Sequence, residues 1–222
     1  MISARTFARQ SAVWSDVTPL LENFVRWANL NEGAYAKRVP GPSSGRLAAV
    51  ISELGFEYSC LHTGRTAHAD PLGFVVQAMN QLPGGRQLRR PHLSVAQEAE
   101  ARALARNIDA FCVDKNVQFR PIIPGCGVVD VASADLVVND TLIEVKSVTR
   151  GFRSSDFRQI LTYLAMKHAS GDFLPRVTVL NPRSGVHCSV TTEFLAQNAA
   201  GASAIELLDA VVGWMSEMQV SA

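Results

Sequence analysis

The stretch ASADLVVNDTLIEVKSV, residues 132–148, decides the fold of this chain. It contains two runs of β-branched and apolar residues, joined by Asn139 and Asp140. A two-residue Asn/Asp connection between such runs is typical of a type I′ β-hairpin. Counted outward from that turn, the register places Asp135 directly opposite Glu144, on the same face of the hairpin.

Two facing carboxylates are an unusual pair in a hairpin, because like charges on opposed residues destabilise a sheet. A cation between the two groups makes the pair favourable, and oxygen ligands of this kind suit Mg²⁺ or Mn²⁺. Lys146 follows Glu144 by two residues, so strand alternation places its ammonium group on the same face. Either acid alone would fit an ordinary solvated strand. The three groups together predict a metal site at which a lysine meets a phosphate or a metal-bound water.

The segments around the hairpin alternate between helical and strand patterns. Residues 94–111 are rich in Ala, Glu, Arg and Leu and predict a helix capped by Ser94, with Gln97 at the capping-box position. Strands are also predicted at residues 117–124, 127–133, 176–182 and 186–192, and helices at residues 155–168 and 204–218. This order predicts an α/β fold in which a mixed central sheet has helices on both sides.

The N-terminal part of the chain has a different pattern. From residue 13 to about residue 81 the apolar residues recur at helical spacing, which predicts three or so helices. The segment PGGRQLRRP, residues 83–91, then introduces turn residues and a small basic cluster. We therefore expect a helical N-terminal region over residues 1–90, serving recognition or assembly, and an α/β domain over residues 91–222.

The composition excludes several classes of protein. Apolar residues make up 47% of the chain, so a globular fold is expected. The net charge is only +1, so the overall charge gives no indication that the protein binds nucleic acid or a membrane. The four cysteines form no CxxC pair, which argues against a metal–thiolate site. No apolar stretch approaches the length of a membrane span and no leader pattern is present, so a cytoplasmic location is expected.

The order Asp135, an eight-residue gap, then Glu144-Val145-Lys146 resembles the signature of the PD-(D/E)XK nuclease superfamily. Downstream, Gln159 and Tyr163 are spaced i, i+4 in the predicted helix and look like the QxxxY element of the RecB-like branch. The resemblance covers about residues 94–192, whereas residues 1–90 match no part of it. The cysteine cluster of the iron–sulfur members of that branch is absent.

The resemblance implies a restriction-endonuclease-like sheet and a set of site residues. Asp135, Glu144 and the Val145 carbonyl would hold one or two Mg²⁺ (or Mn²⁺) ions, and Lys146 would act on the attacking water or the phosphate. The superfamily also places a glutamate on the helix before the sheet, for which Glu98 and Glu100 are rival candidates, Glu98 being followed by the expected small and apolar residues.

Gln159 and Tyr163 would position the substrate or the lysine, as the resemblance implies. On a helical wheel the two residues lie together away from the centre of the apolar stripe, so packing does not obviously require them. Arg150, Arg153 and Arg158 surround the preceding loop and either contact phosphates or are simply solvated.

The expected reaction is hydrolysis of phosphodiester bonds, with DNA as the favoured partner and RNA left open. Restriction, anti-phage defence or repair is the expected context by analogy, with a homodimer or a subunit of a larger complex as the assembly. The alternative is a non-catalytic subunit that keeps the nuclease fold for nucleic-acid binding or assembly. That alternative predicts no metal-dependent activity and no stabilisation by Mg²⁺ or Mn²⁺.

Overall fold

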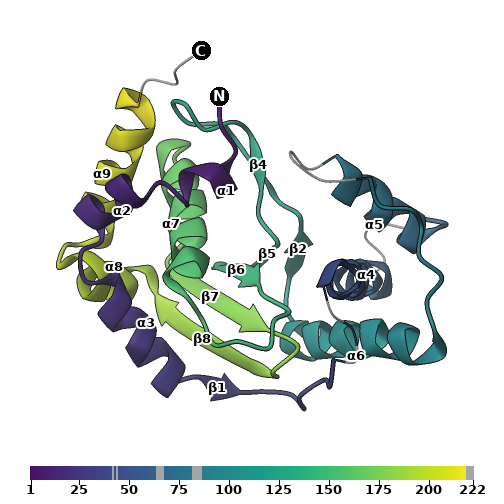
Figure 1. The fold of residues 1–222 in the computed structure, drawn as a ribbon. Coiled ribbons are helices and arrows are strands. Elements are labelled where there is room, and N and C mark those ends of the chain that lie inside the picture. Colours follow the sequence, from purple (N-terminus) through teal and green to yellow (C-terminus); the bar gives the residue numbers. More distant parts are fainter. Residues whose placement is uncertain (42, 44, 64–67, 82–86, 219–222) are drawn as a thin grey trace.

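A mixed six-stranded sheet forms the centre of the protein, which is represented by a computed structural model (Figure 1). The structure describes residues 1–41, 43, 45–63, 68–81 and 87–218. In spatial order the sheet consists of β1 (Gly33–Ala34), β8 (Val186–Thr191), β7 (Arg176–Asn181), β6 (Thr141–Val145), β5 (Leu136–Val138) and β2 (Val117–Phe119). Only β6 and β7 pair in parallel, and helix α7 (Ser154–Ala169) makes the crossover between them. The predicted α/β class with a mixed sheet is confirmed.

The predicted hairpin forms from β5 and β6. Its pairs run from Val138 opposite Thr141 to Leu136 opposite Ile143, as counted from the sequence. Asn139 has φ 54°, a left-handed conformation that asparagine tolerates better than most residues and that a two-residue turn needs. The turn therefore fixes the register that the site depends on.

Two other strand predictions need correction. Residues 117–124 divide into β2 and β3 (Ile122–Ile123), and of residues 127–133 only β4 (Ala132–Ser133) forms a strand, paired with β3 in a separate small sheet. Gly127 has φ 54°, and an added Cβ would lie 2.1 Å from the Met215 carbonyl oxygen, so the chain turns here instead of extending.

Helices cover both faces of the sheet, as Figure 1 shows. One face carries α7 together with α1 (Ala4–Phe7), α2 (Ser11–Val17), α3 (Leu21–Leu30), α8 (Thr192–Ala200) and α9 (Ala204–Glu217), which share the largest apolar core. The other face carries α4 (Gly45–His62), α5 (Pro71–Asn80) and α6 (Val95–Cys112). Strand alternation explains the division, because Leu142 lies in the first core and Ile143 in the second.

The helical prediction for the N-terminal region is confirmed, with one addition. Gly33 and Ala34 pair with His187 and Val186 of β8, so a short strand of this region extends the sheet. The region also contributes to both helical layers, since α1 to α3 pack beside α7 to α9 and α4 packs along α6. Part of the predicted boundary, residues 83–86, lies outside the described residues.

The remaining helix predictions agree with the structure in outline. α6 begins with the predicted capping box between Ser94 and Gln97, and α9 closes the described chain. α8 was not predicted as a separate helix; it begins directly after β8, where Thr191 caps it by accepting a hydrogen bond from the Phe194 amide. Across the described residues, no helix combines the length and apolarity that crossing a membrane requires.

Candidate active site

The β5–β6 hairpin brings two carboxylates to one end of the sheet. Continued by one residue beyond the last β5 pair, the register places Asp135 opposite Glu144. Asp135 Oδ2 accepts a hydrogen bond from the Val145 amide at 2.7 Å, which holds the Asp135 side chain against β6. The Glu144 side chain is 2% exposed and lies on the face of the sheet that α7 covers. The structure therefore shows the two acids facing each other beneath a helix.

Lys146 connects this acidic pair to α7. Its ammonium group donates to Glu144 Oε1 at 2.6 Å and to Gln159 Oε1 at 3.0 Å. The Gln159 amide in turn donates to the Tyr163 hydroxyl at 3.0 Å. Glu144, Lys146, Gln159 and Tyr163 thus form one continuous hydrogen-bonded chain, which fixes the lysine between a carboxylate and an amide.

The expectation that packing does not need Gln159 and Tyr163 is wrong. The two residues are 7% and 6% exposed, and Tyr163 belongs to the main apolar core. A helical wheel treats α7 as a helix with one solvent-facing side, whereas α1, α3 and α9 cover the faces that the sheet leaves open. The polar pair is therefore buried, and each partner satisfies the other.

Burial makes the acidic pair hold its protons more tightly than usual. Burial and then the nearby charge of Asp135 raise the pKa of Glu144 from its ordinary 4.5 to about 8, while Lys146 acts in the opposite direction. Burial also raises the pKa of Asp135, against the hydrogen bond from the Val145 amide and the charge of Lys146. The pKa of Tyr163 is raised as well, first by burial and then by the charge of Glu144.

The donor set fits a hard divalent cation at this position. Glu144 Oε2 is buried and has no hydrogen-bond partner among the described residues, so one oxygen is left for a ligand. The chemistry of the site, two carboxylates and the Val145 backbone carbonyl, is the oxygen set that Mg²⁺ prefers. Within the described ranges no group of three or more His, Cys, Asp or Glu side chains is close enough to hold a metal, so water and substrate oxygens would complete the shell.

The structure does not bring Glu98 or Glu100 to these groups. The Glu98 carboxylate accepts from the Tyr58 hydroxyl at 2.7 Å and from Arg102 at 2.8 Å. Glu100 is buried in an ion pair with Arg183 at 2.7 Å. The small and apolar residues that follow Glu98, namely Ala101, Leu104 and Ala105, are buried as expected. The carboxylates of Glu98 and Glu100, however, pair with side chains outside the site.

Glu53 of α4 is the carboxylate that the sequence reasoning missed. Its pKa is raised by the protein atoms that surround it and then by the charge of Asp135, and it is lowered by three cations that include Lys146. The side chain itself is exposed to solvent. In the sequence Glu53 lies one helical turn from the buried Val50 and from the buried Glu57, but helical spacing does not show that its carboxylate approaches Asp135.

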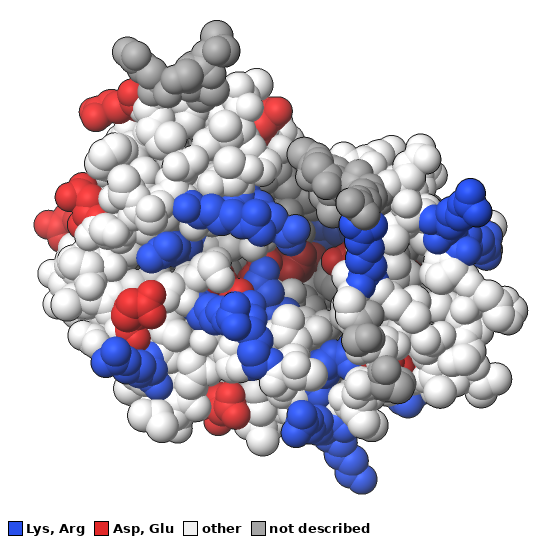
Figure 2. All heavy atoms as spheres, in the orientation of Figure 1, with Lys and Arg blue, Asp and Glu red and all other residues white. Residues whose placement is uncertain are grey.

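A cavity of about 200 Å³ adjoins the site, lined by Arg5, Ala8, Arg9, Lys146, Arg150, Ser155, Asp156 and Gln159. Figure 2 shows a hollow in which red carboxylate atoms lie below a surround of blue Lys and Arg atoms. Of the three arginines noted around the loop before α7, only Arg150 lines this cavity, where it makes two hydrogen bonds with Asp156, at 2.7 and 2.9 Å.

The arrangement therefore combines opposed acids, a fixed lysine and an adjacent basic cavity. Each of these features is suited to handling a phosphate ester with the help of a divalent ion. Comparison of this chain with protein-family models, with curated proteins and with solved structures finds no match.

Proposed function

We propose that this protein is a metal-dependent nuclease that hydrolyses phosphodiester bonds, with DNA as the favoured substrate. The observation that carries the proposal is the pair of facing carboxylates Asp135 and Glu144. One buried Glu144 oxygen has no hydrogen-bond partner in the described part of the chain, and the other accepts from Lys146. The pKa values of both acids are raised, that of Glu144 by burial and then by the charge of Asp135, so the ionised pair is unfavourable for the fold on its own, which supports a role in holding a cation.

The residues of the site would divide the work as follows. Asp135, Glu144 and the Val145 carbonyl would hold a divalent ion, which would supply Lewis-acid stabilisation of the phosphate and a more acidic water. Lys146 presents a fixed positive charge to the phosphate as negative charge develops there. Gln159 holds the lysine in place through its carbonyl oxygen, and Tyr163 holds Gln159 by accepting from its amide.

Glu53 completes the proposed acidic set in the role first considered for Glu98 and Glu100. Its carboxylate senses the charges of Asp135 and Lys146, so it lies within electrostatic range of the site. Because its side chain is exposed to solvent, Glu53 can accept a proton from a water molecule near the acidic pair without forming part of that pair. We assign it an assisting role for that reason.

The resemblance to the PD-(D/E)XK superfamily supports the same function and a restriction-endonuclease-like classification of the sheet. A role in restriction, anti-phage defence or repair rests on that resemblance alone. The same holds for the expected homodimer or larger complex.

The test is cleavage of linear duplex, circular duplex and single-stranded DNA and of RNA, each with Mn²⁺, Mg²⁺ or EDTA. We expect cleavage that requires the metal and is lost in Asp135→Asn and in Lys146→Met. Asp140→Asn is the matched control, since it neutralises an exposed acid in the hairpin turn and should leave activity intact.

If no substrate is cut by the wild-type protein and Mn²⁺ does not raise its melting temperature, the nuclease proposal is wrong. The non-catalytic subunit would then be the better description. Cleavage that persists in Asp135→Asn would instead place the active site elsewhere.

A further inference from the structure

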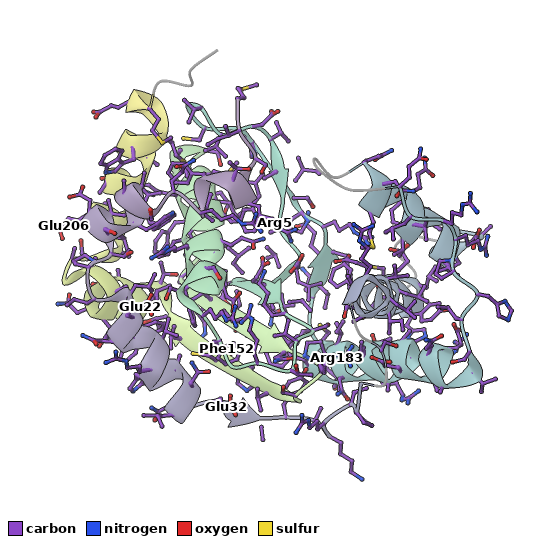
Figure 3. The ribbon with its side chains drawn as sticks, viewed as in Figure 1. Arg5, Glu22, Glu32, Phe152, Arg183 and Glu206 are labelled. Carbon is purple, nitrogen blue, oxygen red and sulfur yellow. The ribbon has the colours of Figure 1, made fainter. Side chains whose placement is uncertain are left out.

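The N-terminal segment contributes two arginines to the cavity beside the site. Arg5 belongs to α1 and Arg9 follows it by one turn, and both line the same cavity as Lys146 and Gln159. Figure 3 shows Arg5 beside α1, on the side of the central strands. Both arginines therefore lie beside Lys146 and Gln159, the two middle members of the hydrogen-bonded chain.

The charges around the cavity do not balance. Lys146 is paired with Glu144, and Arg150 is paired with Asp156. Neither Arg5 nor Arg9 makes an ion pair or a side-chain hydrogen bond with any residue that the structure describes. Two exposed arginines without a counter-charge beside one small polar cavity leave their guanidinium groups free to bind an anion.

The position of Arg5 is supported by a second observation. Its charge lowers the pKa values of Asp135 and Glu144, and it does so also for Glu53. A surface arginine far from the cleft would not reach all three carboxylates, because screening limits such effects to short range. Arg5 is therefore close to the acids as well as to the cavity.

The segment that carries these arginines is firmly attached. The Ile2 amide donates to the Val128 carbonyl at 2.8 Å, and the buried Phe7 accepts through its carbonyl from the Trp14 indole at 3.1 Å. Ala4 and Phe7 belong to the main core, so α1 is fixed on the fold by its apolar side. Arg5 and Arg9 project from a rigid support, which lowers the entropic cost of binding a ligand.

We propose that this cavity binds a backbone phosphate of the nucleic acid next to the scissile phosphate, with Arg5 and Arg9 as its principal ligands. The inference rests on the proposed function for the identity of the neighbouring group. Lys146 and Gln159 belong to both the cavity and the catalytic chain, so the occupant lies beside the reacting phosphate. A guanidinium group can donate two parallel hydrogen bonds to one phosphate, and the first turn of α7, which includes Ser155, adds the positive end of a helix.

The experiment measures binding of labelled single-stranded and duplex DNA by fluorescence anisotropy in EDTA, where no hydrolysis occurs. The test variant is Arg5→Gln/Arg9→Gln. The control is Arg38→Gln/Arg106→Gln, which removes the same charge from exposed positions that do not line the cavity. We expect the test variant to bind roughly tenfold more weakly for each arginine, with the control close to wild type.

Two further measurements show which phosphate the arginines contact: the salt dependence of DNA binding, and the replacement of single phosphates by uncharged linkages. The slope of log K against log salt should fall by about one in the test variant, as for a lost phosphate contact. Replacing single phosphates by methylphosphonates should weaken wild-type binding at one linkage beside the cleavage position, and the test variant should be insensitive to that replacement.

The inference is overturned if the test and control variants bind alike, if the wild-type protein binds neither DNA, or if no single linkage is sensitive. Its failure is distinguishable from that of the nuclease proposal. Arginine-dependent binding without any metal-dependent cleavage would support the cavity and reject the enzyme. Metal-dependent cleavage by a test variant whose DNA binding is unchanged would support the enzyme and reject the phosphate-binding role of the cavity.

Discussion

Raising the pH in the absence of divalent ions should destabilise the protein through Glu144, and Glu144→Gln should remove most of that dependence. In the folded state the pKa of Glu144 is about 8, because the carboxyl group is buried and faces Asp135, whereas its ordinary value is 4.5. The uncharged amide of glutamine occupies nearly the same volume without a charge to bury. The difference in the free energy of unfolding between the wild type and Glu144→Gln therefore measures the cost of burying the Glu144 charge.

The sign and size of the effect follow from proton binding. Below pH 4.5 the carboxyl group is protonated in the folded and the unfolded protein, and its full contribution to stability is present. Between pH 4.5 and about 8 only the folded protein keeps the proton, so the free energy of unfolding falls as the pH rises. At about 1.4 kcal/mol for each tenfold change in proton concentration, the loss across this window is on the order of 5 kcal/mol. Asp135, whose pKa is also raised, acts in the same direction.

The assay is urea unfolding from about pH 4.5 to about pH 8.5 in EDTA, for the wild type, Glu144→Gln and the exposed control Glu217→Gln. The wild type and the control should lose stability steeply, while Glu144→Gln should be flatter and more stable than the wild type at the alkaline end. Adding Mn²⁺ at about a hundredfold excess over its Kd should restore about 2.7 kcal/mol to the wild type and to the Glu217→Gln control, but not to Glu144→Gln. A wild type whose stability does not fall, or a Glu144→Gln variant that falls as steeply, would refute the reasoning.

Three further changes test other parts of the structure. Tyr163→Phe removes the acceptor for the Gln159 amide, so kcat should fall roughly tenfold, the scale of lost outer-shell partners, with little change in KM; an unchanged kcat would argue against a positioning role. Glu98→Gln should retain the wild-type cleavage rate, and a large loss would restore Glu98 to the site. Gly127→Ala should lower the free energy of unfolding by about 2 kcal/mol or more, because its φ is positive and the new Cβ would meet the Met215 carbonyl, and an unchanged urea midpoint would contradict this.

The part of the site that is local in sequence could be predicted. The Asn139-Asp140 turn sets the register of the hairpin, and strand alternation then determines which side chains share a face with Glu144. Similarly, the i, i+4 spacing of Gln159 and Tyr163 is enough to place them one turn apart. These rules act over a few residues, so no knowledge of the whole fold is needed.

The groups supplied by distant segments could not be predicted. Arg5 lines the cavity and Glu53 comes near Asp135 because of the way α1 and α4 dock on the rest of the fold, and helical periodicity does not encode where a helix docks. The same limit explains why Glu98 was favoured. The residues that follow it show which face of α6 is buried, but they do not show which part of the sheet that face packs against. Pairing of Gly33–Ala34 with β8 likewise depends on contacts far apart in the chain.

The parallel crossover from β6 through α7 to β7 has a consequence for the order in which the site assembles. Asp135 to Tyr163 form one continuous hairpin-and-helix unit, so little loop entropy opposes its early formation. Arg5 and Glu53 are joined to that unit only by long-range closures, which are slower. We expect φ-values near the Asn139-Asp140 turn and along α7 to be high and those in α1 to be low. Asp135 and Glu144 would then be brought together during folding before Arg5 and Arg9 reach them.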